Sequence, residues 1–181
     1  MKELEILKAL VAYNGEATLN ELVWSSSFTG TEVNETLESL HARGLVEPKQ
    51  GEEWGLTAKG YEVVEALEKL DREKVAKILR TLPTGEGFYF YRDIGQYTGK
   101  MASSLSEFHK ILDEIEDKSI KFHLDNGDFE RWLAHVGDLE LATRFREIAS
   151  TDLEDKALRS TLLEAVGRRL ETLALLQSLV G

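Results

Sequence analysis

The side chains best suited to acid–base or metal chemistry in this chain are three histidines and two carboxylates near one of them. His109, His123 and His135 could meet in a folded domain, and Asp128 and Glu130 lie close to His123 in sequence. A metal site needs three or four converging ligands, and no spacing here matches a ligand motif such as HExxH. We therefore expect His123 to pack or to hydrogen-bond at the start of the next helix, and we expect no metal and no cofactor.

Two loops share part of a ligand-binding motif but lack its functional residues. Residues 95–100 (GQYTGK) are one residue short of the phosphate-loop pattern, and Met101 stands where a magnesium-binding hydroxyl is required. Residues 125–128 lack the remaining ligands of a calcium loop. The chain also has no cysteine and no visible Ser-His-Asp signature, so we predict that it is not an enzyme. An enzyme built around the His123 region is the weakest alternative.

A second set of polar side chains, in residues 31–43 (TEVNETLESLHAR), is acidic. Glu32, Glu35 and Glu38 lie there, and no lysine or arginine precedes Arg43. Binding to DNA normally depends on lysine and arginine replacing the counterions of the phosphates. Three carboxylates on one helix would therefore oppose the approach of that helix to DNA.

The elements that must position these carboxylates follow from apolar spacing and from capping residues. Apolar residues recur at helical spacing before residue 14, and Thr18 with Glu21 forms the capping-box pattern of a second helix. A third helix ends at Arg43 and Gly44, and a hairpin follows. The expected elements are helices at residues 4–13, 19–24 and 31–43, strands at 45–47 and 54–56, and a fourth helix after Thr57 that residues 71–80 extend or continue.

This order of elements, together with the run RGLVEPKQGEEWGLTAKGYEVVEAL, resembles the winged helix-turn-helix superfamily over residues 1–70. The phrase GLTAKG at residues 55–60 is moderately specific for that superfamily. The resemblance implies a DNA-binding ancestry, but functions are grafted onto folds and can be lost from them. Residues 1–70 carry 13 acidic and 6 basic side chains, which is the opposite of the balance that a DNA-reading face requires.

We therefore predict a non-enzymatic regulator or adaptor whose third helix and wing bind a basic protein surface. A net charge of −11 favours such partners over nucleic acid or anionic membrane, and ribosomal or transcription-machinery components are the plausible class, which the protein would bridge or block. Two alternatives stay open: the glutamates only solvate an exposed helix, or the helix and wing read DNA in a transcription regulator whose C-terminal domain senses a ligand. The predicted contact residues are Glu32, Asn34, Glu35, Glu38, Ser39, Lys49, Glu52 and Glu53.

The second half of the chain is predicted to form an α-rich domain. Residues 82–85 (LPTG) break the helical pattern, so we expect domains at residues 1–80 and 81–181. The predicted fold class is mainly α with a short β-hairpin, in which a winged helix precedes an α-rich domain with an aromatic strand and a long terminal helix. The expected elements of this domain are a strand at 88–91, helices near 105–115, 128–135, 138–148 and 153–179, and a strand or capped turn at 120–124.

Three motifs of this half resemble an uncharacterised, mainly archaeal domain family over residues 85–175. They are IGQYTG at residues 94–99, SLSEF at residues 104–108, and FHL at residues 122–124 followed by GDF and Trp132. The resemblance implies a fold neighbourhood and carries no known activity.

The aromatic block at residues 88–91 (FYFY) has two interpretations. Aromatic residues at strand spacing are typical of a core, whereas Tyr89, Tyr91 and Tyr97, with Arg92 nearby, could stack RNA bases. Exposure of all three tyrosines on one face would favour the stacking of bases.

The terminal helix carries leucine and valine over a surface wider than the single apolar stripe that one packing contact needs. One side can cover its own domain and leave the other for a twin helix, so we predict a homodimer; a helix packed wholly within its own domain is the alternative. The predicted dimer residues are Leu163, Val166, Leu170 and Leu173.

Composition adds two expectations about the setting of the protein. No stretch of about 18 apolar residues exists, and charges interrupt the apolar start MKELEILKAL, so we expect a cytoplasmic protein. Charged residues reach 30%, while Met and Cys are scarce, a drift reported for proteins of hyperthermophiles.

Overall fold

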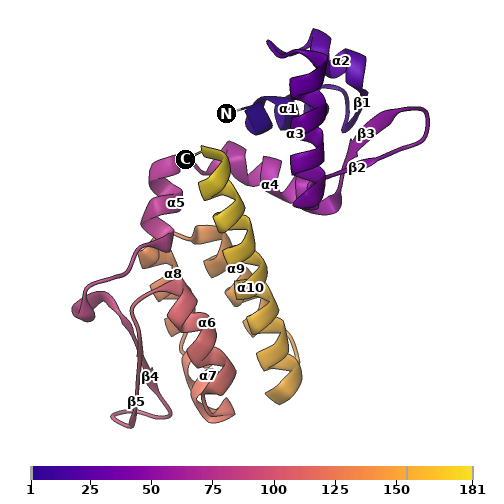
Figure 1. Cartoon of the computed structure of the whole chain (residues 1–181). Coiled ribbons are helices and arrows are strands. Elements are labelled where there is room, and N and C mark those ends of the chain that lie inside the picture. Colours follow the sequence, from indigo (N-terminus) through magenta and orange to yellow (C-terminus); the bar gives the residue numbers. More distant parts are fainter. Residues whose placement is uncertain (1, 154, 181) are drawn as a thin grey trace. The chain divides into compact units, whose positions relative to one another are not determined.

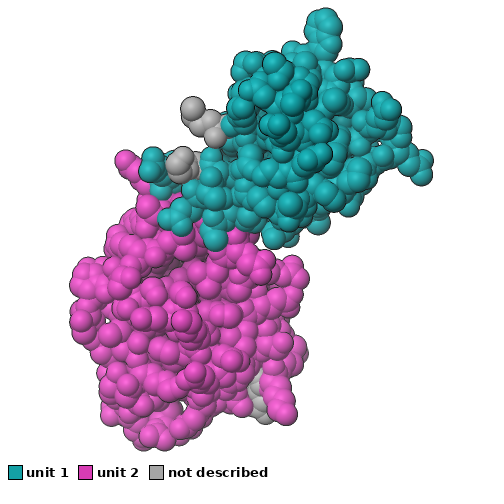
Figure 2. Space-filling view, viewed as in Figure 1, with its two compact units in different colours: residues 1–72, 174–181 teal, residues 73–173 magenta. Residues whose placement is uncertain are grey.

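The computed structural model describes residues 2–153 and 155–180, and these form two compact units (Figures 1 and 2). Unit 1 contains the chain up to Arg72 together with the C-terminal residues from Ala174, and unit 2 is Glu73–Leu173. Helices predominate, with two small antiparallel sheets and a long C-terminal helix, which confirms the predicted mainly α class.

Unit 1 has the predicted helices and hairpin, with one short strand in addition. The strand β1 pairs with β3, which gives a three-stranded antiparallel sheet in the order β1-β3-β2. Figure 1 shows the β2–β3 hairpin beside α3. The elements are α1 (Lys2–Ala12), β1 (Glu16–Thr18), α2 (Leu19–Trp24), α3 (Gly30–Ala42), β2 (Val46–Pro48), β3 (Glu53–Leu56) and α4 (Ala58–Lys69).

The core of unit 1 forms where the apolar stripes of α1 and α3 meet the sheet and α4. Leu7, Leu37 and Leu45 are fully buried there. Gly60 lets α4 approach the chain closely, because a Cβ atom at this position would lie 2.1 Å from the backbone oxygen of Leu45. The second glycine of the GLTAKG run is therefore a packing requirement.

The fourth helix is not extended through residues 71–80, which corrects one of the two expectations for this segment. Leu70 has extended backbone angles (φ −120°, ψ 120°), so α4 ends at Lys69. A separate helix, α5 (Arg72–Leu79), follows directly after Asp71, a residue type that favours the cap position of a new helix. The predicted domain division after residue 80 falls just beyond α5.

Unit 2 combines helices with a two-stranded sheet. Residues 120–124 belong to a helix, α7, and not to a strand, because Ile120, His123 and Leu124 are buried at the i, i+3, i+4 spacing of a helical face. The remaining elements are η1 (Thr84–Glu86), β4 (Phe88–Tyr91), β5 (Tyr97–Ala102), α6 (Leu105–Glu114), α7 (Asp117–Asp125), α8 (Asp128–Val136), α9 (Leu139–Ala149) and α10 (Asp155–Val180).

The terminal helix α10 buries one stripe within its own chain, and this corrects the proposed dimer seam. Val166 and Leu173 are completely buried, so neither can face a twin helix, whereas Leu163 and Leu170 are half-buried. The 3.6-residue period places both buried residues on the side that packs against neighbouring elements. The homodimer stays a prediction, but Val166 and Leu173 do not form its seam.

The buried stripe of α10 also contains a charged residue, Arg169, which is 8% exposed. Its Nε and Nη2 atoms each donate to the Asp138 carboxylate at 2.8 Å, and Nη1 donates to Glu140 at 3.1 Å. Asp138 also accepts from the backbone N–H of Leu141 and so caps α9. This fork connects α10 to the start of α9 through an ion pair that is satisfied on both sides.

Candidate functional site

The exposed surface of α3 is the first candidate site. Val33, Leu37 and Leu40 face the core, so the opposite side of the helix presents Asn34 and two carboxylates to solvent. The side-chain amide of Asn34 donates to Glu38 Oε1 at 3.0 Å, one helical turn away. We call Asn34, Glu35 and Glu38 the acidic face.

Glu32 does not belong to the acidic face, although the sequence placed it there. Its carboxylate accepts hydrogen bonds from the backbone and hydroxyl of Thr29, each at 2.9 Å, and thus completes a capping box at the start of α3. Lys2 Nζ lies 2.7 Å from the other oxygen. The hydrogen bond from Lys2, followed by those from Thr29, lowers the pKa of Glu32 to about 2. Glu32 therefore anchors α3 and α1 instead of facing a partner.

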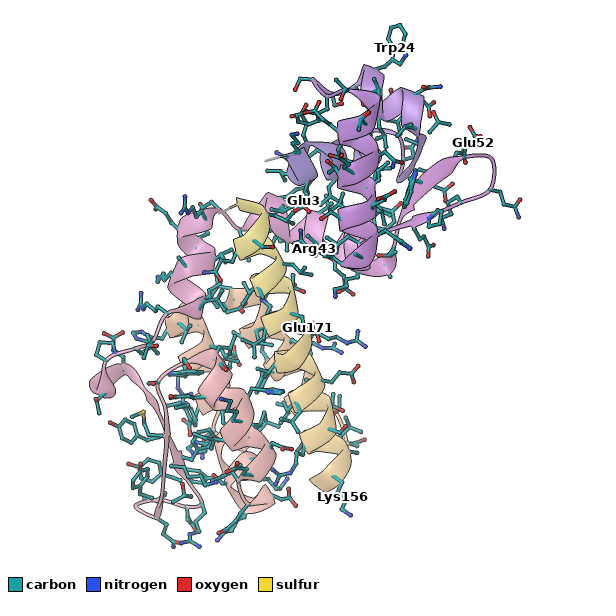
Figure 3. All side chains as sticks on the ribbon, in the orientation of Figure 1. Glu3, Trp24, Arg43, Glu52, Lys156 and Glu171 are labelled. Carbon is teal, nitrogen blue, oxygen red and sulfur yellow. The ribbon has the colours of Figure 1, made fainter. Side chains whose placement is uncertain are left out.

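Ser39, another predicted contact residue, is also engaged inside unit 1. Its hydroxyl donates to Glu3 Oε1 at 2.8 Å, and Arg43 pairs with the other oxygen of Glu3 (Figure 3). Arg43 reaches further to the hydroxyl of Ser178 at 2.6 Å. Burial acts to raise the pKa of Glu3, but hydrogen bonds from Ser39 and Arg43 lower it. This network connects α1, α3 and the end of α10 within unit 1.

The β2–β3 hairpin carries Lys49, which is likewise paired. Its Nζ atom lies 2.7 Å from Glu47 and 3.8 Å from Glu16, and its carbon chain crosses Gly55 in β3. Glu52 is exposed at the tip of the hairpin with a positive φ of 65° (Figure 3), and Glu53 is half-buried at the start of β3. The two cations nearest the predicted contact residues of α3 and the hairpin, Arg43 and Lys49, are therefore both paired with carboxylates of unit 1.

Trp24 is a feature of unit 1 that the sequence did not single out. It is the last residue of α2 and is 88% exposed, and its ring projects away from unit 1 (Figure 3). A helical wheel of α2 could have predicted this exposure. It places Trp24 away from the face of the helix that buries Leu22. A large exposed aromatic ring is a typical anchor of protein interfaces.

The histidine region of unit 2 is the second candidate site. Here the hydrogen bonds of His123 hold the fold together. His123 is buried; its Nε2 accepts the backbone N–H of Tyr91 at 2.7 Å, which leaves Nδ1–H to donate to Asp128 Oδ2 at 2.7 Å. This confirms the predicted bond to the start of α8. Burial lowers the pKa of His123, while Asp128 acts to raise it. Both ring nitrogens are occupied, so neither can serve a substrate as base.

The other two histidines do not converge on His123. His109 lies 3.2 Å from the backbone oxygen of Leu163, and His135 lies 3.4 Å from Glu86. Within residues 2–153 and 155–180, no group of three or more His, Asp or Glu side chains is placed to hold a metal ion. None of the described helices is long and apolar enough to cross a bilayer.

Comparison with known proteins gives one match. The model of a family of unknown function, DUF5752, matches residues 60–167, from within α4 to the middle of α10. No curated protein and no solved structure matches the chain.

Proposed function

The chain belongs to the DUF5752 family, and we propose that unit 1 is a winged-helix module that has exchanged DNA binding for the recognition of a basic protein surface. The family itself has no assigned function, so the proposal is based on the chemistry of unit 1. The proposed partner class is a basic component of the translation or transcription machinery, which the protein would bridge or block.

The arrangement of elements supports the winged-helix assignment. Two helices joined by a short turn, α2 and α3, are followed by a hairpin whose strand β3 pairs with β1. In a helix-turn-helix protein the second helix of such a pair reads the major groove, and the hairpin supplies the wing. The acidic face of α3 therefore occupies the position from which a DNA-binding relative would contact bases.

The observation that carries the proposal is the state of the charges around α3. Glu35 and Glu38 are exposed, while the nearby cations Arg43 and Lys49 already have carboxylate partners within unit 1. Contact with phosphates would require breaking these ion pairs and bringing two carboxylates against a polyanion. A surface rich in lysine and arginine meets neither penalty, and opposite charge accelerates its association.

Fluorescence anisotropy with two probes tests the proposal. One probe is a labelled short peptide rich in lysine and arginine, and the other is a labelled mixed-sequence DNA duplex. We expect the full chain to bind the peptide with an affinity that falls as salt rises, and to leave the duplex unbound at physiological ionic strength. Tight binding of the duplex would overturn the proposal.

Charge-reversal variants distinguish peptide binding at the acidic face from diffuse attraction to the net charge of the protein. Glu35→Lys with Glu38→Lys should weaken peptide binding about tenfold or more, because like charges then meet in the contact. Glu62→Lys with Glu68→Lys is the matched control, since it makes the same charge change at exposed positions of α4 in the same unit. An equal loss in both double variants would show that only net charge matters.

A further inference from the structure

The sheet of unit 2 has two chemically different faces. Along β4 the phenylalanines Phe88 and Phe90 are buried, whereas Tyr89 and Tyr91 alternate with them and are half-buried on the opposite face. Tyr97 from β5 is 43% exposed and joins these two tyrosines. Its ring centroid lies 5.9 Å from that of Tyr89 and 5.4 Å from that of Tyr91. We call Tyr89, Tyr91 and Tyr97 the tyrosine face.

The backbone under the tyrosine face is held firmly. The N–H of Tyr91 donates to His123, and its carbonyl accepts from the hydroxyl of Ser119 at 2.8 Å, so α7 fixes β4 from the side. Thr98 Oγ1 donates to the carbonyl of Phe90 at 2.7 Å and fixes β5 against β4. The phenylalanine rings behind β4 pack in the core. The three tyrosines are therefore preorganised, which lowers the entropy cost of binding a ligand.

The hydroxyl groups of the tyrosine face differ in their partners. Tyr89 donates to the backbone oxygen of Thr84 at 2.8 Å. In the part of the chain that the structure describes, the hydroxyls of Tyr91 and Tyr97 have no hydrogen-bond partner and can donate to a ligand. Ile94, in the turn of the hairpin between them in sequence, is 88% exposed and adds apolar surface.

The charges around the hairpin balance one another. Arg92 lies 3.4 Å from Glu116, Lys118 lies 3.5 Å from Asp93, and Lys100 lies 2.7 Å from Glu114. Proteins that stack single-stranded nucleic acid combine aromatic rings with a positively charged groove. The balanced charges here give no such groove and favour an uncharged ligand.

The size of the tyrosine face favours a short ligand over a second copy of the chain. A stable dimer buries about 800 Å² on each partner. The tyrosine face has three side chains, two of them half-buried, and one exposed isoleucine beside them. A short extended peptide matches such a surface better than a folded domain does.

We propose that the tyrosine face binds an extended proline-rich peptide. A polyproline II segment has no internal hydrogen bonds, so its carbonyl groups can accept from the hydroxyls of Tyr91 and Tyr97. Its proline rings can pack on the outer surface of the three tyrosine rings, as proline-rich segments do on the aromatic-lined grooves of SH3 and WW domains. The peptide carries its bound conformation in the free state, which suits a small surface with few anchors. This site is in unit 2 and is independent of the function proposed for unit 1.

A titration with labelled oligoproline tests this site, with a glycine–serine peptide of equal length and an oligouridine RNA as alternative probes. We expect saturable binding of oligoproline alone, accompanied by shifts of the ring signals of the three tyrosines in NMR spectra. Binding of the glycine–serine peptide with equal affinity would overturn the proposal. Tighter binding of the RNA would overturn it in favour of base stacking, and a dimer that depends on Tyr97 would overturn it in favour of self-association.

Variants at Tyr97 and Trp24 complete the test. Tyr97→Ala should weaken oligoproline binding about tenfold, and Tyr97→Phe, which keeps the ring and removes the hydroxyl, should weaken it less. Trp24→Ala removes an even more exposed ring from unit 1 and should leave the affinity unchanged. A loss in Trp24→Ala equal to that in Tyr97→Ala, or no loss in either Tyr97 variant, would contradict the proposal.

Discussion

The carboxylates of α3 in unit 1 and the carboxylate of Asp138 in unit 2 show how one residue type serves two purposes. Glu35 and Glu38 lie in solvent, where a pair with a cation contributes little to stability. Asp138 is buried, and the fork of Arg169 and the N-terminus of α9 satisfy it. The comparison teaches that a carboxylate is available to a partner only where the fold does not already use it.

The largest effect that tests this comparison is expected in unit 2. Arg169→Met leaves the Asp138 carboxylate buried without its cation, so the free energy of unfolding should fall by about 3–5 kcal/mol. Arg168→Met is the matched control, because the neighbouring Arg168 pairs with Glu164 at the surface and should change stability by about 0.5 kcal/mol or less. Denaturant unfolding measures both changes, and similar values would contradict the assigned roles.

A smaller effect is expected from the close packing that positions α4 in unit 1. Gly60→Ala places a methyl group against the backbone oxygen of Leu45, so the free energy of unfolding should fall by about 1–3 kcal/mol. Gly85→Ala meets no atom within 4 Å and serves as control. If Gly60→Ala unfolded at the same temperature as the control, that result would contradict the close approach of α4 to the backbone of Leu45.

The pH dependence of stability sharpens the interpretation of His123. Burial lowers its folded-state pKa below the unfolded value of about 6.5. The unfolded state then binds more protons below pH 6.5, so stability falls as the pH is lowered through this range, by at most about 1.4 kcal/mol per pH unit. The His123→Gln variant should be less stable at neutral pH. Its stability should also lose the part of the pH dependence that comes from the titration of His123. An identical slope in both proteins, from urea unfolding between neutral and mildly acidic pH, would exclude His123 as its source.

The smallest stability effects are expected on α3, where they separate the anchoring glutamate from the acidic face. Glu35→Gln and Glu38→Gln should each leave the unfolding temperature almost unchanged, because neither carboxylate has a cationic partner among the described residues. Glu32→Gln removes the negative charge that pairs with Lys2 and should lower the unfolding temperature more than either. The reverse order in thermal unfolding would contradict the anchoring role of Glu32.

Much of the local structure could be predicted from the sequence because its causes are local. The capping box at Thr18, the buried stripe of α3, the aromatic strand and the bond from His123 to the start of α8 all depend on residues within a few positions of one another. The short strand β1 escaped detection because three residues carry too little periodicity.

The roles of individual charges could be predicted less well, because their partners are distant in sequence. Lys2 reaches Glu32 across 30 residues, and Arg169 reaches Asp138 across 31. The Thr29–Glu32 capping pattern was nevertheless present in the sequence and would have identified Glu32 as an anchor. For α10, helical periodicity places Val166 and Leu173 on one stripe but does not reveal whether the same chain or a second copy covers it.

The measurement that tests the central claim most directly is an NMR titration of the ¹⁵N-labelled full chain with the lysine- and arginine-rich peptide. The side-chain amide of Asn34 donates to Glu38 and reports on cations that approach that carboxylate. The account predicts that this amide and the backbone amides of Glu35 and Glu38 shift first, and that a DNA duplex leaves them unchanged. Shifts caused by the duplex, or peptide shifts that avoid α3, would contradict it.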